Sequence, residues 1–265
     1  MICVRARPLF SSPLSLSFSS STTKHSPTLL RLPRRSLSTV AMSSSSTTTP
    51  PEIIEHIVLF KVKPETDSTK IASMLNGLNS LLSLSQVLHI SASPLHRVRS
   101  SPSLFTHVLH SRYRSKDDLN AYAAHPDHVR VVKESVLPIC EDVMAVDWVA
   151  DRVPGTLAPP PGSAAKLTFL KVKEGGDKEE IVGVIKGLRE RIPGVGEITV
   201  GENFSPARAK GFSIASIAFF RDLGEMESVD GEKELVDGEK EKVREFIDST
   251  IVVEFVVPSG LVSGL

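Results

Sequence analysis

The feature that most restricts how this chain can fold is a domain-sized pattern that occurs twice. The stretch LFKVK at 59–63 is echoed by FLKVK at 169–173, and an apolar helix stripe and further strands follow both stretches. Seven of the eight histidines lie from His56 to His128, whereas the second copy contains none. We therefore expect two similar units, with any acid–base chemistry confined to the first.

The first copy, residues 53–150, reads as alternating strands and helices. Alternation puts His56, Val58 and Phe60 on one face of the first strand. Asp67 or Ser68 is then expected to cap a helix with an apolar stripe. The further predicted elements are a strand at 87–91, a strand ending near 113 with Phe105, His107 and Leu109 on one face, helices at 116–124 and 127–137, and a closing strand with Met144, Val146 and Trp148.

The second copy, residues 165–258, repeats this plan. A helix stripe through Ile181 and Leu188 precedes strands at 195–200, 212–220 and 251–257, and a charged helix is expected at about 239–247. Each copy is thus β-α-β-β-α-β, an α+β, ferredoxin-like plan with helices on one face of an antiparallel sheet. Because the other face of each sheet needs a cover, we predict that the two copies pair sheet to sheet as an intramolecular dimeric α/β barrel.

The segments outside the two copies resemble signals that target a protein to an organelle. Residues 1–51 are basic and rich in Ser and Thr, and the first acidic residue of the chain is Glu52. This composition is typical of an organelle transit peptide and favours a plastid, although a disordered tail without an address is an alternative. The tail, 259–265, ends in Ser263-Gly264-Leu265, which is similar to the peroxisomal tripeptide Ser-Lys-Leu. Residues 151–164 read as a Pro/Gly linker.

The bulk composition excludes several classes of partner. The chain has 31 basic and 31 acidic residues, so there is no electrostatic case for nucleic acid or an anionic membrane. No apolar run is long enough to span a membrane. Cys3 belongs to the leader, which leaves Cys140 alone and excludes a disulfide framework or a cysteine metal site.

Several short motifs identify a family. They are His56-Ile-Val-Leu-Phe-Lys, Phe105-Thr-His107, Tyr122-Ala-Ala-His125-Pro126-Asp127-His128 and Val146-Asp147-Trp148. With them the first copy resembles the stress-responsive dimeric α/β-barrel family of plants and bacteria, while the second copy matches only as a pattern. The resemblance implies the paired-barrel fold, and two-domain plant members are associated with peroxisomes.

The family includes olivetolic acid cyclase, which folds a linear polyketide by intramolecular aldol condensation. By that resemblance His128 is the base and Tyr122 holds the thioester carbonyl oxygen. His56, His107 and Phe60 would line the ligand pocket. Pro126 would place His128 in the first turn of a helix, where the positive helix end lowers the pKa of an imidazole. A neutral imidazole can accept a proton near pH 7.

Other interpretations of the same residues stay open. The histidines can instead specify the fold as caps and hydrogen-bonded core residues. Some relatives hold a magnesium ion on backbone carbonyls, which here would lie near Leu82 and Ser85; otherwise no cofactor is expected. His89, His96 and His110 read as surface or loop residues. In the second copy Lys166 and Ile214 replace His56 and His107, so that copy is expected to be a scaffold.

The leading hypothesis is therefore a stress-associated barrel protein that binds a small hydrophobic or carbonyl-bearing ligand in its first copy. A cyclase-like enzyme is the alternative, and a heat-stable assembly protein without a pocket is the third hypothesis. Association of two such pseudo-dimers into a homodimer is left open.

Overall fold

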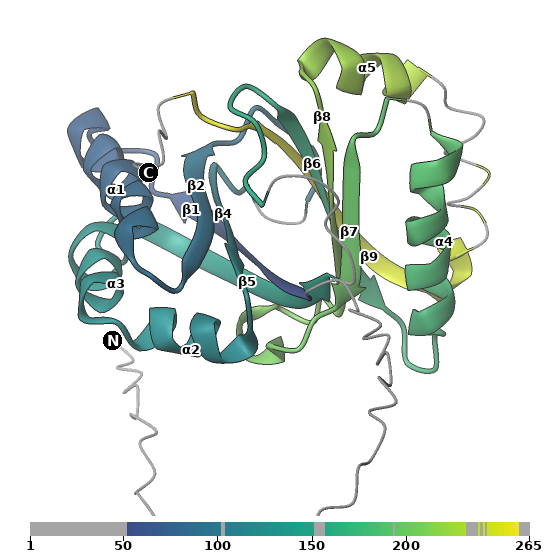
Figure 1. Ribbon diagram of the computed structural model, residues 1–265, viewed down its shortest axis with the longest axis horizontal. Helices are drawn as coiled ribbons and strands as arrows, with labels where there is room; N and C mark the ends of the chain where they lie inside the picture. The colour runs from purple at the N-terminus through teal and green to yellow at the C-terminus, as the bar shows by residue number, and fades with distance from the viewer. Residues whose placement is uncertain are drawn as a thin grey trace, which may run out of the picture. The chain divides into compact units, whose positions relative to one another are not determined.

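Two antiparallel sheets lie face to face, and helices cover the outer face of each (Figure 1). The computed structural model describes residues 52–101, 104–150, 157–192, 194–231, 238, 241 and 243–259. The leader, residues 151–156 of the Pro/Gly linker and the C-terminal tripeptide therefore lie outside the described residues. Of the predicted charged helix at about 239–247, residues 239, 240 and 242 lie outside them too, and its C-terminal part is a 3-10 turn at 244–246 that leads into a strand from Ile247. No helix within the described part of the chain is long and apolar enough to cross a membrane.

The first half, residues 53–150, contains more elements than one ferredoxin-like unit requires. In chain order they are β1 (Ile53–Val62), α1 (Ser68–Ser80), the 3-10 turn η1 (Leu81–Ser83), β2 (Val87–Pro94), β3 (Arg97–Ser100), β4 (His107–Tyr113), α2 (Lys116–Ala124), α3 (Pro126–Val131), the π-helical turn η2 (Val132–Val136) and β5 (Cys140–Ala150). The predicted helix at 127–137 is present in two parts, because α3 ends at Val131 and the chain continues as a π-helix to Val136.

The second half, residues 164–257, follows the same order with fewer helices described. Its elements are β6 (Ala164–Val172), α4 (Lys178–Arg191), β7 (Glu197–Glu202), the 3-10 turn η3 (Pro206–Arg208), β8 (Ile214–Phe220), α5 (Leu223–Gly231), the 3-10 turn η4 (Arg244–Phe246) and β9 (Ile247–Val256). Local chemistry begins the helices as expected. The side chain of Asp67 accepts a hydrogen bond from the Thr69 amide at 2.8 Å, and Pro126 takes the first position of α3.

The two sheets exchange chain segments. Their strand orders are β2-β4-β1-β5 and β3-β9-β6-β8-β7, so β3 of the first half forms the edge of the second sheet. The exchange is reciprocal: the His96 amide donates to the Glu254 carbonyl at 2.7 Å, and the Phe204 amide of the second half donates to the Asp147 carbonyl at 2.9 Å. The halves are thus joined by backbone hydrogen bonds as well as by the faces of their sheets.

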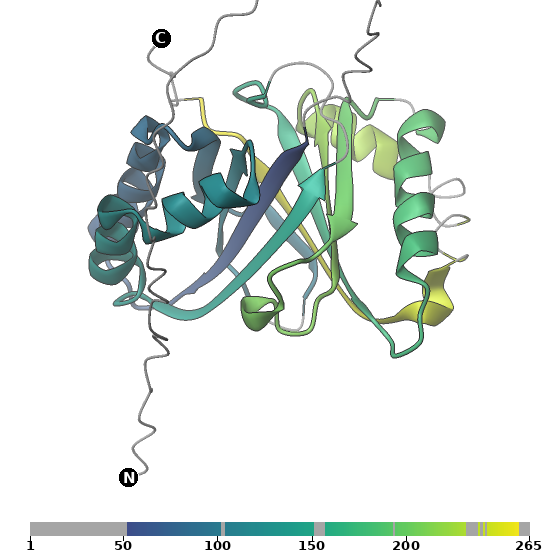
Figure 2. The same ribbon diagram turned by 60° about the horizontal axis from the view of Figure 1, so that its bottom comes forward.

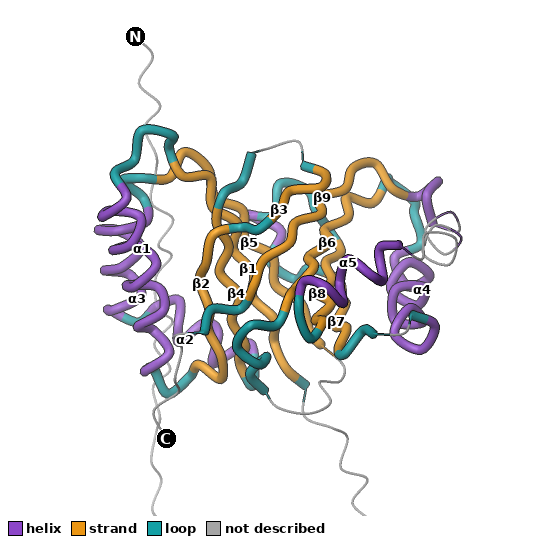
Figure 3. The backbone as a smooth tube through the Cα atoms, turned by 90° about the horizontal axis from the view of Figure 1, so that it is seen from above, coloured by secondary structure: helices purple, strands orange, loops and turns teal. Residues whose placement is uncertain are grey.

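The space between the sheets is an apolar core, which confirms the predicted intramolecular barrel. Trp148 and Leu59 of the first half pack there with Phe169 and Phe255 of the second. Figure 2 and Figure 3 show the strands gathered in the middle and the helices on the two outer sides. Along β1, residues alternate between this core and a second core under the helices, where Phe60 lies.

Phe105 corrects the expectation that it shares a face with Leu109. Phe105 packs in the core between the sheets, whereas Leu109 lies in the core under the helices. The reason is that β4 begins only at His107, so Phe105 precedes the strand and does not follow its alternation.

Candidate functional sites

Four aromatic rings meet between β1, β4 and the helices α2 and α3; we call His56, Tyr113, Tyr122 and His128 the ring cluster. The ring centroids of Tyr122 and His128 are 4.5 Å apart, and those of Tyr122 and Tyr113 are 5.1 Å apart. His56 lies 6.5 Å from Tyr122 in an edge-on arrangement. The helix after Ser115 and the turn at Pro126 thus bring three of the predicted site residues, His56, Tyr122 and His128, together.

His128 is placed to act as a base. Its Nδ1 donates to the Ala123 carbonyl at 3.0 Å, because a carbonyl can only accept, and the lone pair of the neutral ring therefore lies on Nε2. Burial is the main cause that lowers the pKa of His128, with the bond to Ala123 acting in the opposite direction. Burial also raises the pKa of Tyr122, so its hydroxyl stays protonated. The pair can accept and donate protons near neutral pH.

Asp147 orients His56. Its Oδ1 contacts His56 Nδ1, and both side chains are buried. Burial raises the pKa of Asp147, but His56 and a hydrogen bond from Ser205 outweigh this effect and hold the pKa below its usual value. Segment 203–208 of the second half closes this end of the site, because the Asn203 side chain accepts from the Asp147 amide at 3.1 Å. Sequence reasoning had no signal for this contribution of the second half.

His107 and Phe60 lie away from the ring cluster. They pair with each other across β1 and β4, while His56 pairs with Ser111. Ser111 follows His107 by four residues along β4, so the His107–Phe60 pair lies about 13 Å along the strand from His56. His107 Nδ1 instead contacts Thr106 Oγ1 at 2.8 Å.

The predicted magnesium position, at the backbone carbonyls near Leu82 and Ser85, stays a prediction. The Leu81 carbonyl accepts from the Leu84 amide at 3.1 Å, and the Ser85 carbonyl accepts from Arg114 Nη1 at 3.4 Å. Among the residues that the structure describes, no group of three or more His, Cys, Asp or Glu side chains is arranged to hold a metal.

Charged side chains and one hydroxyl lie deep between the two sheets, where none was predicted. We call this group, formed by Glu55, His110, Arg112, Glu197 and Thr199, the charge cluster. Arg112 donates to Glu55 Oε1 at 2.9 Å through Nη2, and the same nitrogen contacts Glu197 of the second half. His110 Nε2 lies 2.7 Å from Glu55 Oε2, and Thr199 Oγ1 donates to Glu55 at 3.0 Å. Glu55, His110 and Arg112 are 0 % exposed.

Opposite charges stabilise this cluster against the cost of burial. Burial raises the pKa of Glu55, but Arg112 and His110 outweigh it and hold the pKa far below its usual value. Burial lowers the pKa of His110, and it lowers the pKa of the neighbouring His89 to about 2. The prediction that His89 and His110 lie at the surface is therefore wrong, because both face the space between the sheets; His96 is exposed, as expected.

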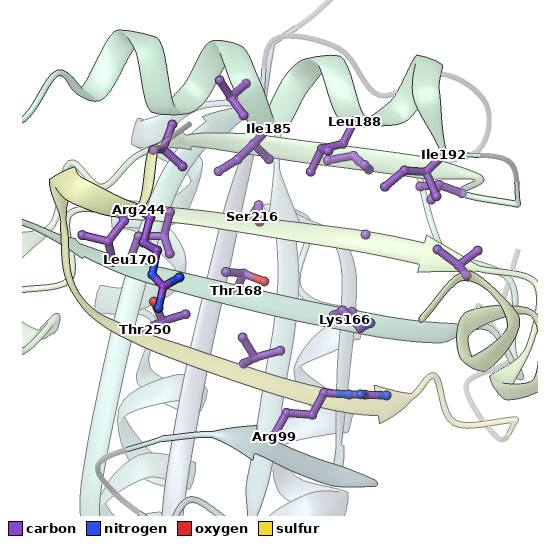
Figure 4. A pocket seen from close by; sticks show the side chains of 18 of the residues that line it. Arg99, Lys166, Thr168, Leu170, Ile185, Leu188, Ile192, Ser216, Arg244 and Thr250 are labelled. Atoms are coloured by element: carbon purple, nitrogen blue, oxygen red, sulfur yellow. The ribbon is translucent and has the colours of Figure 1, made fainter. Parts of the chain in front are cut away.

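A cavity of about 870 Å³ lies in the second half, between α4 and the outer face of the second sheet; we call it the second-half cavity. Ile185 and Leu188 of α4, with Ile192 just after the helix, face Thr168 and Ser216 of the sheet across it (Figure 4). Its wall is mostly apolar, and the charged side chains stand at its ends. A volume of this size is sufficient for a drug-sized ligand.

The second half was expected to be only a scaffold, and the sheet wall of this cavity differs in sequence from the matching surface of the first half. By the strand registers, Thr168 stands where the first half has Val58, Ser216 where it has Leu109, and Ala218 where it has Ser111. Two of these three positions thus exchange a branched apolar side chain for a hydroxyl. In the first half, the bulky ring of Tyr122 fills the space under the helices. The second half has no tyrosine, and space opens in its place.

These observations define the class of protein: a tandem pair of ferredoxin-like units closed into one barrel. The family model described as "Stress responsive A/B Barrel Domain" matches residues 54–150 and again 164–257. The chain therefore belongs to the stress-responsive A/B barrel family.

Two Arabidopsis thaliana proteins, both described as stress-response A/B barrel domain-containing proteins, are similar over most of the chain. The chain is 69% identical to the first over 263 residues, which cover 98% of this chain and 97% of that protein. It is 56% identical to the second, DABB1, over 209 residues, or 78% of this chain and 98% of that protein. A solved structure of an anthrone oxidase-like protein is similar in fold, with a TM-score of 0.51 at 15% identity, over 81% of this chain and 97% of that one.

Proposed function

We propose that this stress-responsive barrel protein acts by binding a small, predominantly apolar molecule in the second-half cavity. The observation that carries the proposal is the cavity itself, about 870 Å³ in volume and lined by apolar side chains of α4 and the second sheet. Hydroxyl groups of Thr168, Ser216 and Thr250 provide a few polar contacts on its wall. An apolar pocket with few polar groups is typical of sites for small molecules.

Filling the cavity should abolish this binding. Ala218→Phe places a ring on the sheet wall of the cavity, and we expect it to weaken binding of the neutral fluorescent probe N-phenyl-1-naphthylamine by about tenfold or more. Fluorescence titration of the full chain measures the effect. Ala72→Phe on the exposed face of α1 is the matched control and should leave binding unchanged. Equal affinity in both variants, or no binding by the parent protein, would contradict the proposal.

A second candidate function is carbonyl chemistry in the first half, and the geometry of the ring cluster favours it. His128 offers a neutral Nε2 on a ring whose centroid lies 4.5 Å from that of Tyr122, and Asp147 orients His56 next to them. This arrangement suits removal of a proton next to a carbonyl, as in the aldol condensation of a polyketide cyclase.

Linear tetraketide thioesters test this candidate. A cyclase would convert them, and His128→Ala would lower the rate by about 100-fold or more, because a positioned general base contributes at least that much. Product formation is followed by mass spectrometry. His96→Ala, an exposed histidine of the same half, is the control. No turnover by the parent protein, or full turnover by His128→Ala, would exclude the cyclase and leave binding or a purely structural role.

A further inference from the structure

The two ends of the second-half cavity differ in charge. At one end Arg99 and Lys166 line the wall, and at the other Arg244 stands beside Leu170 (Figure 4). Lys166 and Leu170 are four residues apart on β6, which separates the ends by about 13 Å. The Arg244 end carries both signs of charge, because Arg244 pairs with Glu241 at 3.2 Å and Asp248 pairs with Lys171 at 3.2 Å.

The Arg99 and Lys166 end presents positive charge to the cavity. Both cations contact Glu254: Arg99 through its Nε, and Lys166 with its Nζ at 3.6 Å. Arg97 also approaches Glu254, at 3.7 Å. Glu254 is 0 % exposed and does not line the cavity, so this carboxylate is covered while Arg99 and Lys166 form part of the wall. A ligand at this end therefore lies against positively charged groups.

The first half supplies part of this end. Arg97 and Arg99 lie on β3, which crosses from the first half to pair with β9, whereas Lys166 and Glu254 belong to the second half. The charged end of the cavity is therefore complete only when the two halves are paired. The exchange of β3 thus has a chemical result in addition to covering an edge of the sheet.

We propose that the second-half cavity takes an amphipathic monocarboxylic acid, with its carboxylate against Lys166 and Arg99 and its apolar chain along α4. This inference rests on the proposed function and names the class of ligand. A carboxylate accepts from an ammonium and a guanidinium at once, and hydrogen bonds between ionised partners are stronger than those between neutral ones. The apolar chain would run past Leu188 and Ile185 toward the Arg244 end.

Competition between matched ligands tests the inference. Dodecanoate and dodecanol displace N-phenyl-1-naphthylamine from the full chain at a pH of about 8, where the free carboxyl is ionised. We expect the parent protein to prefer dodecanoate by about tenfold or more. Lys166→Met keeps the aliphatic stem and should reduce this preference, measured as the ratio of the two affinities in the same variant, to about threefold or less. Lys166→Arg should restore the preference.

Controls separate the different ways in which the inference can fail. Lys70→Met removes a cation from the exposed side of α1, outside the cavity, and should leave the preference intact. Arg99→Met gives a second test should Lys166→Met fold poorly, and it should lower the preference in the same way. Probe binding without a preference for dodecanoate, or a preference that Lys166→Met and Arg99→Met leave unchanged, would overturn the inference and keep the proposed function. Absence of probe binding would overturn both.

Discussion

Replacing Trp148 by alanine should lower the free energy of unfolding by about 3–5 kcal/mol, the usual cost of removing a large buried ring. Trp148 is 0 % exposed in the core between the sheets. Gly201 of the second half packs against it, since a Cβ at Gly201 would lie 3.0 Å from Trp148 Cδ1. The ring therefore supports the pairing of the two halves, and its loss leaves a void that facing strands cannot close.

Urea unfolding followed by far-UV circular dichroism measures this loss, because Trp148 is the single tryptophan and its fluorescence disappears with it. Leu104→Ala is the control: Leu104 is 73% exposed, so its substitution should cost less than about 0.5 kcal/mol. A cost below about 1 kcal/mol for Trp148→Ala would mean that the halves do not pair through this core.

Removing the carboxylate of the charge cluster should have a similar effect. We expect Glu55→Ala to destabilise the protein by about 3–5 kcal/mol, because it leaves the guanidinium of Arg112 buried with its main partner gone. Glu55 also accepts from Thr199 of the second half at 3.0 Å, so the substitution removes a hydrogen bond between the halves as well. Urea unfolding of the full chain gives the value.

A surface ion pair provides the comparison. Glu141 lies 2.8 Å from Lys61 with both side chains about a third exposed, and Glu141→Ala should cost less than about 1 kcal/mol. Replacing Glu55 and Arg112 together by methionine should recover part of the loss, since no buried charge of that pair is then left alone. If Glu55→Ala costs no more than Glu141→Ala, the charge cluster is not buried between paired sheets.

The charge cluster also explains why each half suits the other better than a second copy of itself. The strand registers place Ala165 and Phe219 of the second half at the positions of Glu55 and Arg112, and Glu197 at the position of His89. Two first halves would bring His89, not a carboxylate, to the guanidinium. Two second halves would bury Glu197 against a phenylalanine ring. The first arrangement leaves Arg112 with the carboxylate of Glu55 alone, and the second leaves the charge of Glu197 unpaired, which is costly in the interior.

The amino-acid sequence by itself determined the duplicated α+β plan, the sheet-to-sheet pairing and the capping residues. It also determined that His56 and Phe60 share a face of β1, because strand alternation and helix periodicity are local properties of the chain. The resemblance to the family, carried by β1 and by the segment around Pro126, predicted that His56, Tyr122 and His128 meet. The distance of His107 from the ring cluster was not predicted. His107 lies four residues along β4 from the residue that pairs with His56, and a shared face does not fix the distance along a strand.

Only the tertiary structure decided which side chains meet between the halves. Glu55, His110 and Arg112 are types that are usually exposed, and their burial depends on Glu197 and Thr199, which lie far away in sequence. The crossing of β3 depends on a free sheet edge in the other half. The second-half cavity arises where side chains are too small to fill the space under α4. An unfilled volume has no sequence motif, because it is a property of the packing of several elements together.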